Sequence, residues 1–299
     1  MRNFVVFFTG KEGSSPLMHL LDNFPQVSII RSGNPKGGGL EPFDQHQCGP
    51  MSDRDLRRSL EMVLGGKGLD LEKLNRIYLK TSRGGSINEV REGTALGFKM
   101  RPKFPRENHF MVPHFFESNE GFARIFRRNR RQSFLKMARK ILEKTGAVAF
   151  FALRQDLLRW SLSRYHGDGS CRPGNMQFKL AEGKISRDDI GKIAVDCGKL
   201  EQIIAQAEQM LAGKMQIVRD FRACGIEAHP LFYEDFLEDK VSYFTRLFRI
   251  LEIDITVQDI ENALDKGAYF QKVHSSDISE FVVNHEEVLE RFSGYQYLG

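Results

Sequence analysis

The sequence predicts an α/β protein in which a parallel β-sheet lies between two layers of helices. Two continuous apolar runs, residues 3–9 and 147–153, have the composition of strands that are buried on both faces. A helical pattern follows each run, at residues 16–24 and at about 156–165. Repeated strand-then-helix units are typical of a three-layer parallel sheet.

Glycine and proline separate the other expected elements. Gly146 precedes the strand 147–153, and Pro102 follows an earlier strand. Residues 32–50 are rich in Gly, Pro and Asn, which indicates a long surface loop. The remaining elements that we expect are strands at 95–100 and 228–232 and helices at 52–64, 133–144, 187–223 and 239–251.

Length and composition indicate one ordinary globular domain. The chain has 299 residues, of which 41% are hydrophobic and 28% are charged. We expect a single domain over residues 1–299, with long loop and helix insertions around 32–68 and 102–132.

No apolar run approaches the roughly 20 residues that a membrane span needs. The run from Phe4 to Phe8 is too short for a secretory signal. The four cysteines form no metal-binding spacing, so neither a disulfide framework nor a metal site is expected. We therefore expect a cytoplasmic protein with reduced thiols and without a membrane span.

The charge balance is modestly basic, with a formal net charge of +5 and a pI of about 9.0. Such an excess favours anionic ligands. Much of it lies between residues 124 and 140, where aromatic and aliphatic residues are interleaved with basic ones. This stretch is either a solvated helix face beside a buried one or a docking surface for an acidic acceptor.

The first candidate site is the loop from Thr9 to Ser15, between a buried strand and the start of a helix. Such a turn directs backbone N–H groups and a helix N-terminus to one point, which suits phosphate oxygens. Gly13 permits close approach of the backbone, Lys11 supplies a cation, and Ser14 offers a hydroxyl. The loop lacks the spacing of a Walker A motif, and a Gly/Ser turn after a strand is also compatible with a plain turn.

The second candidate site begins at Arg154, directly after the strand 147–153. Its guanidinium is expected at the carboxyl edge of the sheet, where open α/β sheets bind ligands. Bidentate phosphate contact suits arginine, and Ser163, nine residues later on a helix, is placed to complete a phosphate pocket. The alternative is that Arg154 is a salt-bridge partner.

These segments resemble the family of sulfotransferases that use 3'-phosphoadenosine-5'-phosphosulfate (PAPS). The family's 5'-phosphosulfate loop is similar to the segment Lys11-Glu12-Gly13-Ser14-Ser15. Its 3'-phosphate site, an Arg at a strand end and a later Ser, is similar to Arg154 and Ser163. A third landmark of the family is similar to Tyr233-Glu234-Asp235-Phe236.

The chain also departs from the family pattern. Glu12 replaces a small polar residue. Ser161 is a second candidate, beside Ser163, for the serine of the 3'-phosphate site. Many members of the family contact the nucleotide through a segment near the C-terminus, and Lys272 is the candidate for that contact here. We expect Glu234 and Asp235 to be structural, capping a helix or pairing with basic groups.

The resemblance implies a P-loop-NTPase-like sulfotransferase fold and transfer of a sulfuryl group from PAPS, with 3',5'-ADP as product and no metal. Lys11 would stabilise the departing 5'-phosphate. Glu41 is our first choice for the base that activates the acceptor, followed by His46 and then Asp44, although all three also suit a solvated loop.

The resemblance leaves the acceptor and the oligomeric state open. The expected acceptor group is a hydroxyl, with an amine as second choice. A carbohydrate is favoured over a glycolipid or a small hydroxylated metabolite, and no nucleic-acid partner is expected.

Two other functions are compatible with parts of the sequence. A nucleotide-dependent kinase with an atypical phosphate loop would need a Mg²⁺-binding hydroxyl after the loop lysine, whereas Lys11 precedes the glycine here. A non-enzymatic protein that binds nucleic acid or another acidic ligand would use the basic stretch 124–140, and its affinity would depend steeply on salt.

Overall fold

A computed structural model of the chain describes the greater part of its length. The described residues are 1–10, 12–31, 41–43, 51–65, 69–79, 86–101, 135–168, 180, 182–186, 189, 191–267 and 277–297. For residues 53, 79, 167 and 168 this description is limited to the backbone.

Five parallel strands form one sheet in the order β2-β3-β1-β4-β5. Strand β1 lies at the centre, where Phe4 is paired with Gly97 on one side and with Val148 on the other. The strands are β1 (Phe4–Phe7), β2 (Val27–Ile29), β3 (Ala95–Met100), β4 (Val148–Leu153) and β5 (Ala228–Phe232). The predicted α/β class with a parallel sheet is therefore confirmed.

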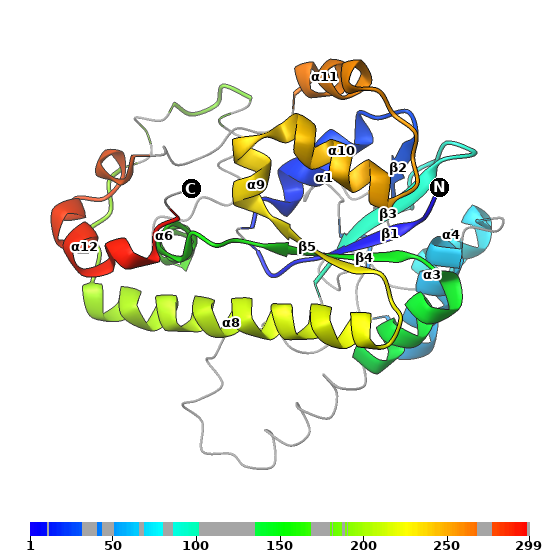
Figure 1. Cartoon of the computed structure of the whole chain (residues 1–299), viewed down its shortest axis with the longest axis horizontal. Helices are drawn as coiled ribbons and strands as arrows, with labels where there is room; N and C mark the ends of the chain where they lie inside the picture. The colour runs from blue at the N-terminus through cyan, green and yellow to red at the C-terminus, as the bar shows by residue number, and fades with distance from the viewer. Residues whose placement is uncertain are drawn as a thin grey trace, which may run out of the picture.

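Helices cover both faces of this sheet (Figure 1). One face carries α1 (Ser14–Asp22), α9 (Tyr233–Glu238), α10 (Lys240–Ile250) and α11 (Val257–Asp265). The other carries α3 (Asp53–Gly65), α4 (Leu71–Leu79), the helical residues 135–145 and the C-terminal part of α8 (Cys197–Ala223). The result is the predicted three-layer arrangement.

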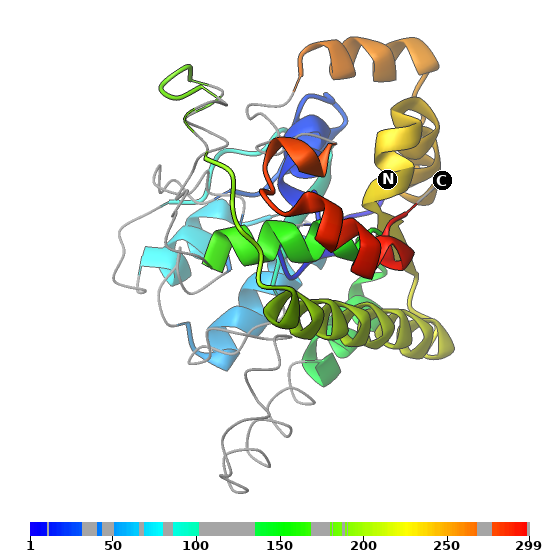
Figure 2. The same ribbon diagram turned by 90° about the vertical axis from the view of Figure 1, so that its left-hand side faces the viewer.

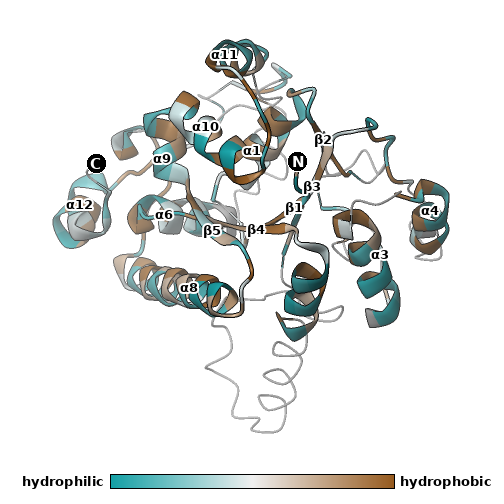
Figure 3. Ribbon diagram, turned by 45° about the vertical axis from the view of Figure 1, so that its right-hand side comes forward, coloured by the Kyte–Doolittle hydropathy of each residue, from teal (hydrophilic) through white to brown (hydrophobic). Residues whose placement is uncertain are grey.

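The central strand β1 is apolar at every position because both of its faces are covered. Phe4 and Val6 pack into the core on the α1 face, whereas Val5 and Phe7 pack into the core on the α3 face. Consecutive side chains of a strand point to opposite faces, so a strand covered on both faces needs apolar residues throughout. In Figure 3 the strands are mostly brown, while the surrounding helices show both brown and teal sides.

A further group of helices lies beyond the carboxyl ends of the strands (Figures 1 and 2). Helix α6 (Leu157–Asp168) follows β4 and packs against the N-terminal part of α8. The 3-10 turns η2 (Ile278–Glu280) and η3 (Ser293–Tyr295) and helix α12 (His285–Phe292) join the same core. The C-terminal segment of the chain thus supports α6 at the edge where the strands end.

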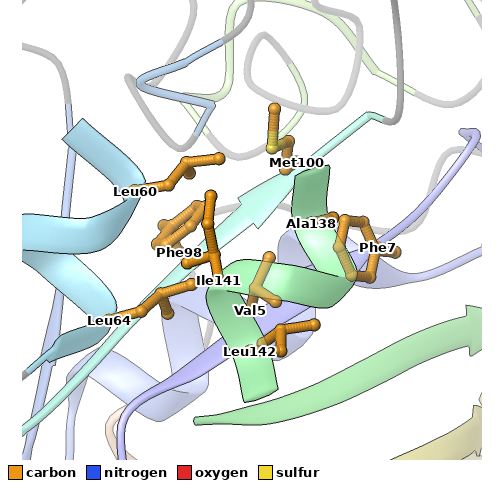
Figure 4. Close-up of a pocket in the computed structure, with 9 residues that line it drawn as sticks. All are labelled: Val5, Phe7, Leu60, Leu64, Phe98, Met100, Ala138, Ile141 and Leu142. Atoms are coloured by element: carbon orange, nitrogen blue, oxygen red, sulfur yellow. The ribbon is translucent and has the colours of Figure 1, made fainter. Parts of the chain in front are cut away.

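A small cavity lies inside the core on the α3 face (Figure 4). Nine apolar side chains line it, from β1, β3, α3 and the helix 135–145: Val5, Phe7, Leu60, Leu64, Phe98, Met100, Ala138, Ile141 and Leu142. Because no polar group lines it, the cavity is a packing gap in the core and offers nothing to an anionic ligand.

The sequence placed most strands well but misjudged several other elements. Strands β3 and β5 have the predicted bounds, and the long helix was predicted to begin at residue 187. That prediction was wrong, because residues 191–196 are not helical and α8 begins at Cys197. The carboxylate of Asp196 accepts a hydrogen bond from the Lys199 backbone N–H and so caps the helix there.

The short strand β2 and helices α4, α11 and α12 were not predicted. The prediction of a single domain stays a prediction, and its insertion at 102–132 lies outside the described residues. In the described part of the chain, we find no helix that combines the length and the apolar character that crossing a bilayer requires.

Gly97 gives a direct test of how tightly the central strands pack. A Cβ atom at this position would lie 2.0 Å from an atom of the Phe4 ring, which is fully buried. We expect Gly97→Ala to lower the free energy of unfolding by about 1–3 kcal/mol, because the ring has no free volume to move into. Urea unfolding followed by circular dichroism measures this change.

Gly213→Ala is the matched control, because a Cβ atom there meets nothing within 4 Å and the site is inside helix α8. That substitution should raise the free energy of unfolding by roughly 0.5–1 kcal/mol. Equal unfolding midpoints for Gly97→Ala and the unmodified protein would contradict the packing described for β1 and β3.

Candidate functional site

Two neighbouring strands, β1 and β4, send the chain to opposite faces of the sheet. After β1 the chain enters α1 on one face, and after β4 it passes through α6 to α8 on the other. Ligands of open parallel sheets bind outside the carboxyl ends of the strands at such a reversal. The loops that follow β1 and β4 therefore define the candidate site.

Gly13 shapes the loop after β1. It has a φ of 70° and is the N-cap residue of α1, so the loop turns through a conformation that favours glycine. The ring of Tyr233, the first residue of α9, lies against it, and a Cβ atom on Gly13 would come within 2.1 Å of that ring. The first N–H groups of α1 lie just beyond this turn, at Ser14 and Ser15.

Helix α6 holds the same loop from the other side. The indole Nε1 of Trp160 donates a hydrogen bond to the carbonyl oxygen of Gly10 at 3.0 Å. Ser163 lies three residues further along α6 and therefore on the same face as Trp160. Ser161 is fully buried, and its hydroxyl has no hydrogen-bond partner among the described residues. This geometry favours Ser163 over Ser161 as the serine that faces the loop.

Arg154 follows β4 at the same edge, as predicted. Its Nε lies 3.8 Å from Oε1 of Glu234, and its guanidinium carbon lies 5.3 Å from the centre of the Tyr233 ring. Burial lowers the pKa of Arg154, while Asp156, Tyr233 and Glu234 act in the opposite direction. The same Tyr233 ring thus contacts both Gly13 and Arg154, so the two predicted phosphate sites lie side by side.

Glu234 fixes the loop after β4. Its carboxylate accepts hydrogen bonds from the backbone N–H groups of Gln155 and Asp156, each at 3.0 Å. Asp235 pairs with Arg246 at 2.7 Å. The predicted structural roles of these two acidic residues are confirmed, and the salt bridge expected as the alternative role of Arg154 is also present.

A second charged cluster lies at the end of β3. Nζ of Lys99, only 3% exposed, donates to the Ser15 hydroxyl at 2.5 Å and lies 3.4 Å from Oε1 of Glu41. Nε of Arg101 lies 3.2 Å from Oε2 of the same carboxylate. One ammonium group therefore connects the helix-capping loop with Glu41, the predicted base.

The sequence placed Glu12 in the loop that resembles a phosphate-binding segment, but the structure buries its side chain. Glu12 is 3% exposed, and its carboxylate forms an ion pair with Nζ of Lys214 on α8 at 2.5 Å. Burial lowers the pKa of Lys214, and the Glu12 carboxylate opposes this effect. The side chain of Glu12 therefore points into the protein, which leaves its backbone as the part available to a ligand.

Several predicted site residues lie outside the described residues. These are Lys11, Asp44, His46 and Lys272. Their predicted roles stay predictions.

Sequence reasoning missed Lys99, Tyr233 and Lys214 as parts of this site, and it did not foresee the contact of Trp160 with Gly10. For Lys99 a signal existed, because a lysine near the end of an otherwise apolar strand must find a partner. Tyr233 was noted as part of a family landmark but without its contact to Gly13. Lys214 carried no signal, because lysines are ordinary in a long helix.

Comparison with known proteins finds solved structures of low similarity and no matching sequence. No protein-family model and no curated protein matches the chain. Sulfotransferase STF1 from Mycobacterium tuberculosis has 12% identity and a TM-score of 0.40, over 98% of this chain and 76% of that one.

A sulfotransferase from Alicyclobacillus acidocaldarius has 15% identity and a TM-score of 0.41, over 99% of this chain and 92% of that one. The sulfotransferase domain from the curacin biosynthetic pathway has 11% identity and a TM-score of 0.41, over 100% and 93%. All three are sulfotransferases. Similarity at these identities and TM-scores does not establish an activity for this chain.

Burial and nearby positive charge both act on the pKa of His19 on α1. Burial, followed by the charges of Arg31 and Lys99, lowers the pKa of His19 from 6.5 to about 4. The folded state therefore holds the neutral imidazole, whereas the unfolded chain takes up a proton below about pH 6.5. Stability should be lost as the pH falls from 6.5 towards 4.

Replacing His19 with Gln removes this proton uptake. We expect His19→Gln to lose less free energy of unfolding than the unmodified protein between pH 7 and pH 4.5. Urea unfolding midpoints across this range measure the difference. If the two proteins lose stability in parallel, burial and the nearby positive charges do not lower the pKa of His19 as described.

Proposed function

We propose that the chain is a sulfotransferase that transfers a sulfuryl group from PAPS to a hydroxyl group of an acceptor. One observation carries this proposal: Tyr233 packs against Gly13 of the loop after β1 and also lies beside Arg154 after β4. A glycine turn at a helix N-terminus and a strand-end arginine, two elements that suit anions, therefore lie close together. A nucleotide that carries phosphates at both ends fits this pair.

The residues present suit such a donor. The turn at Gly13 has no room for a side chain, and no side chain caps the N-terminus of α1, which suits phosphate oxygens. We assign the 5'-phosphosulfate end to Gly13, Ser14 and Ser15, and the 3'-phosphate to Arg154 and Ser163. The backbone of Glu12 belongs to the first group, and Lys272 stays a candidate for the second.

When bound, PAPS would supply the sulfuryl group and a phosphate leaving group. The acceptor oxygen bonds to sulfur as the bond from sulfur to the phosphate oxygen breaks, so negative charge increases on that phosphate. Lys11 and Lys99 are the cations that we assign to this charge. Lys99 is supported by its contact with Ser15 at 2.5 Å, beside the first turn of α1.

Glu41 is the base that we propose for the acceptor proton. Its carboxylate lies beside Lys99, which contacts the loop where the sulfuryl group would be held. A base must reach the acceptor oxygen while that oxygen faces the sulfur, and this position is compatible with both demands. His46 and Asp44 stay as alternatives. A carbohydrate hydroxyl is the acceptor that we favour.

Titration calorimetry with 3',5'-ADP tests the proposed function. We expect the unmodified protein to bind it and Arg154→Ala to bind about ten- to a hundredfold more weakly, because a charge-assisted phosphate contact is lost. Arg76→Ala is the matched control, since Arg76 lies on α4 with two thirds of its side chain exposed and pairs with Glu72. Its affinity should equal that of the unmodified protein.

Two outcomes would contradict this proposal. Undiminished affinity in Arg154→Ala would remove the 3'-phosphate assignment. Tight binding of ATP with Mg²⁺, together with no binding of 3',5'-ADP, would favour the kinase alternative.

A further inference from the structure

Lys214 is a buried lysine that the proposed reaction has not used. It lies on α8 with 2% of its surface exposed, between the apolar residues Met210 and Ile217 of the same helix face. Taking an ammonium group out of water is costly unless it is paired and hydrogen-bonded. The partners of Lys214 therefore deserve a functional explanation.

Those partners belong to the two strand ends of the candidate site. Nζ of Lys214 donates to Oε1 of Glu12 at 2.5 Å and to the carbonyl oxygen of Ala152 at 2.9 Å. Glu12 lies in the loop after β1, and Ala152 lies in β4 two residues before Arg154. One ammonium group of α8 thus contacts both sides of the site.

Glu12 transmits this contact into the loop. Its Oε2 accepts a hydrogen bond from the Thr9 backbone N–H at 2.8 Å, and its Oε1 accepts one from the Thr9 hydroxyl. Thr9 also contacts Sδ of Met210 at 3.0 Å, one helical turn before Lys214 on α8. The carboxylate of Glu12 therefore links the start of the loop to α8 through hydrogen bonds.

A carboxylate inside an anion-binding loop creates an electrostatic problem. At a separation of roughly 6 Å and an effective dielectric constant of about 20, an uncompensated carboxylate would weaken the binding of a unit anion by about a hundredfold. The ammonium of Lys214, in direct contact with Glu12, cancels most of that field. The loop then presents its backbone N–H groups without a net negative charge behind them.

We propose that Lys214 is a positioning residue for the donor loop: through Glu12 it fixes the loop after β1 and neutralises the charge that would repel an anionic donor. This inference rests on the proposed function for the identity of the donor. The contacts that fix the loop concern the free protein and are testable without any ligand.

Three variants separate the two parts of this proposal. Lys214→Met removes the ammonium but keeps most of the apolar stem, which leaves the carboxylate of Glu12 uncompensated. The double variant Glu12→Gln with Lys214→Met removes both charges and keeps an amide oxygen that can accept from Thr9. Lys199→Met is the matched control, because Lys199 is an exposed lysine on the same helix.

The first measurement is hydrogen–deuterium exchange of the peptide that covers residues 4–17 in the ligand-free protein. We expect faster exchange in Lys214→Met than in Lys199→Met, and a return towards the unmodified rate in the double variant. Equal exchange in Lys214→Met and Lys199→Met would overturn the positioning role. This result does not depend on which ligand the protein binds.

The second measurement is the affinity for 3',5'-ADP by calorimetry. Lys214→Met should bind at least tenfold more weakly than Lys199→Met, and the double variant should recover most of that loss. A double variant that binds no better than Lys214→Met would overturn the electrostatic part. If the unmodified protein itself does not bind 3',5'-ADP, the proposed function fails, and the exchange experiment alone decides the role of Lys214.

Lys214→Met leaves the buried carboxylate of Glu12 without a counter-charge and is therefore at risk of not folding. In Glu12→Gln the buried ammonium keeps two acceptors, the carbonyl oxygen of Ala152 and the amide oxygen of the new side chain. Glu12→Gln then decides the electrostatic part, because it removes the carboxylate and keeps the ammonium. We expect this variant to bind 3',5'-ADP at least as tightly as the unmodified protein. Binding that is tenfold weaker would overturn the proposal.

Discussion

The parallel pairing of β1 with β4 is the constraint on which the site depends. The two strands lie side by side in register from Phe4 and Val148 onward, so their carboxyl ends reach the same edge of the sheet. The chain then leaves them towards opposite faces, into α1 after β1 and through α6 into α8 after β4. Open parallel sheets bind their ligands at such a reversal, and charged side chains of this chain lie at this edge of the sheet.

The charged side chains at this edge of the sheet are paired with one another. Lys99 and Arg101 pair with Glu41 at one end, Glu234 pairs with Arg154 at the other, and Glu12 pairs with Lys214 beneath the loop. Such pairs fix the orientation of each side chain. In-line transfer requires reacting groups that are held in a fixed orientation. The aromatic side chain of Tyr233 joins the two ends, because it contacts both Gly13 and Arg154.

Patterns of apolar residues were sufficient to predict the fold class, because strands covered on both faces must be apolar throughout, as β1 and β4 are. They also placed Gly13 and Arg154 at strand ends, and neighbouring parallel strands bring such ends together. The contacts of Lys214 with Glu12 and of Trp160 with Gly10 were not predictable, since they join residues about 200 and 150 positions apart. Strand β2 has three residues, too few for a periodic signal.

The central claim is that one nucleotide bridges the ends of β1 and β4, and a crystal structure of the protein with 3',5'-ADP tests it most directly. The account predicts one phosphate group at the N-terminus of α1, against the backbone of Gly13 and Ser14, and the other beside the guanidinium of Arg154. A nucleotide bound elsewhere, or one whose phosphates touch neither Gly13 nor Arg154, would contradict it.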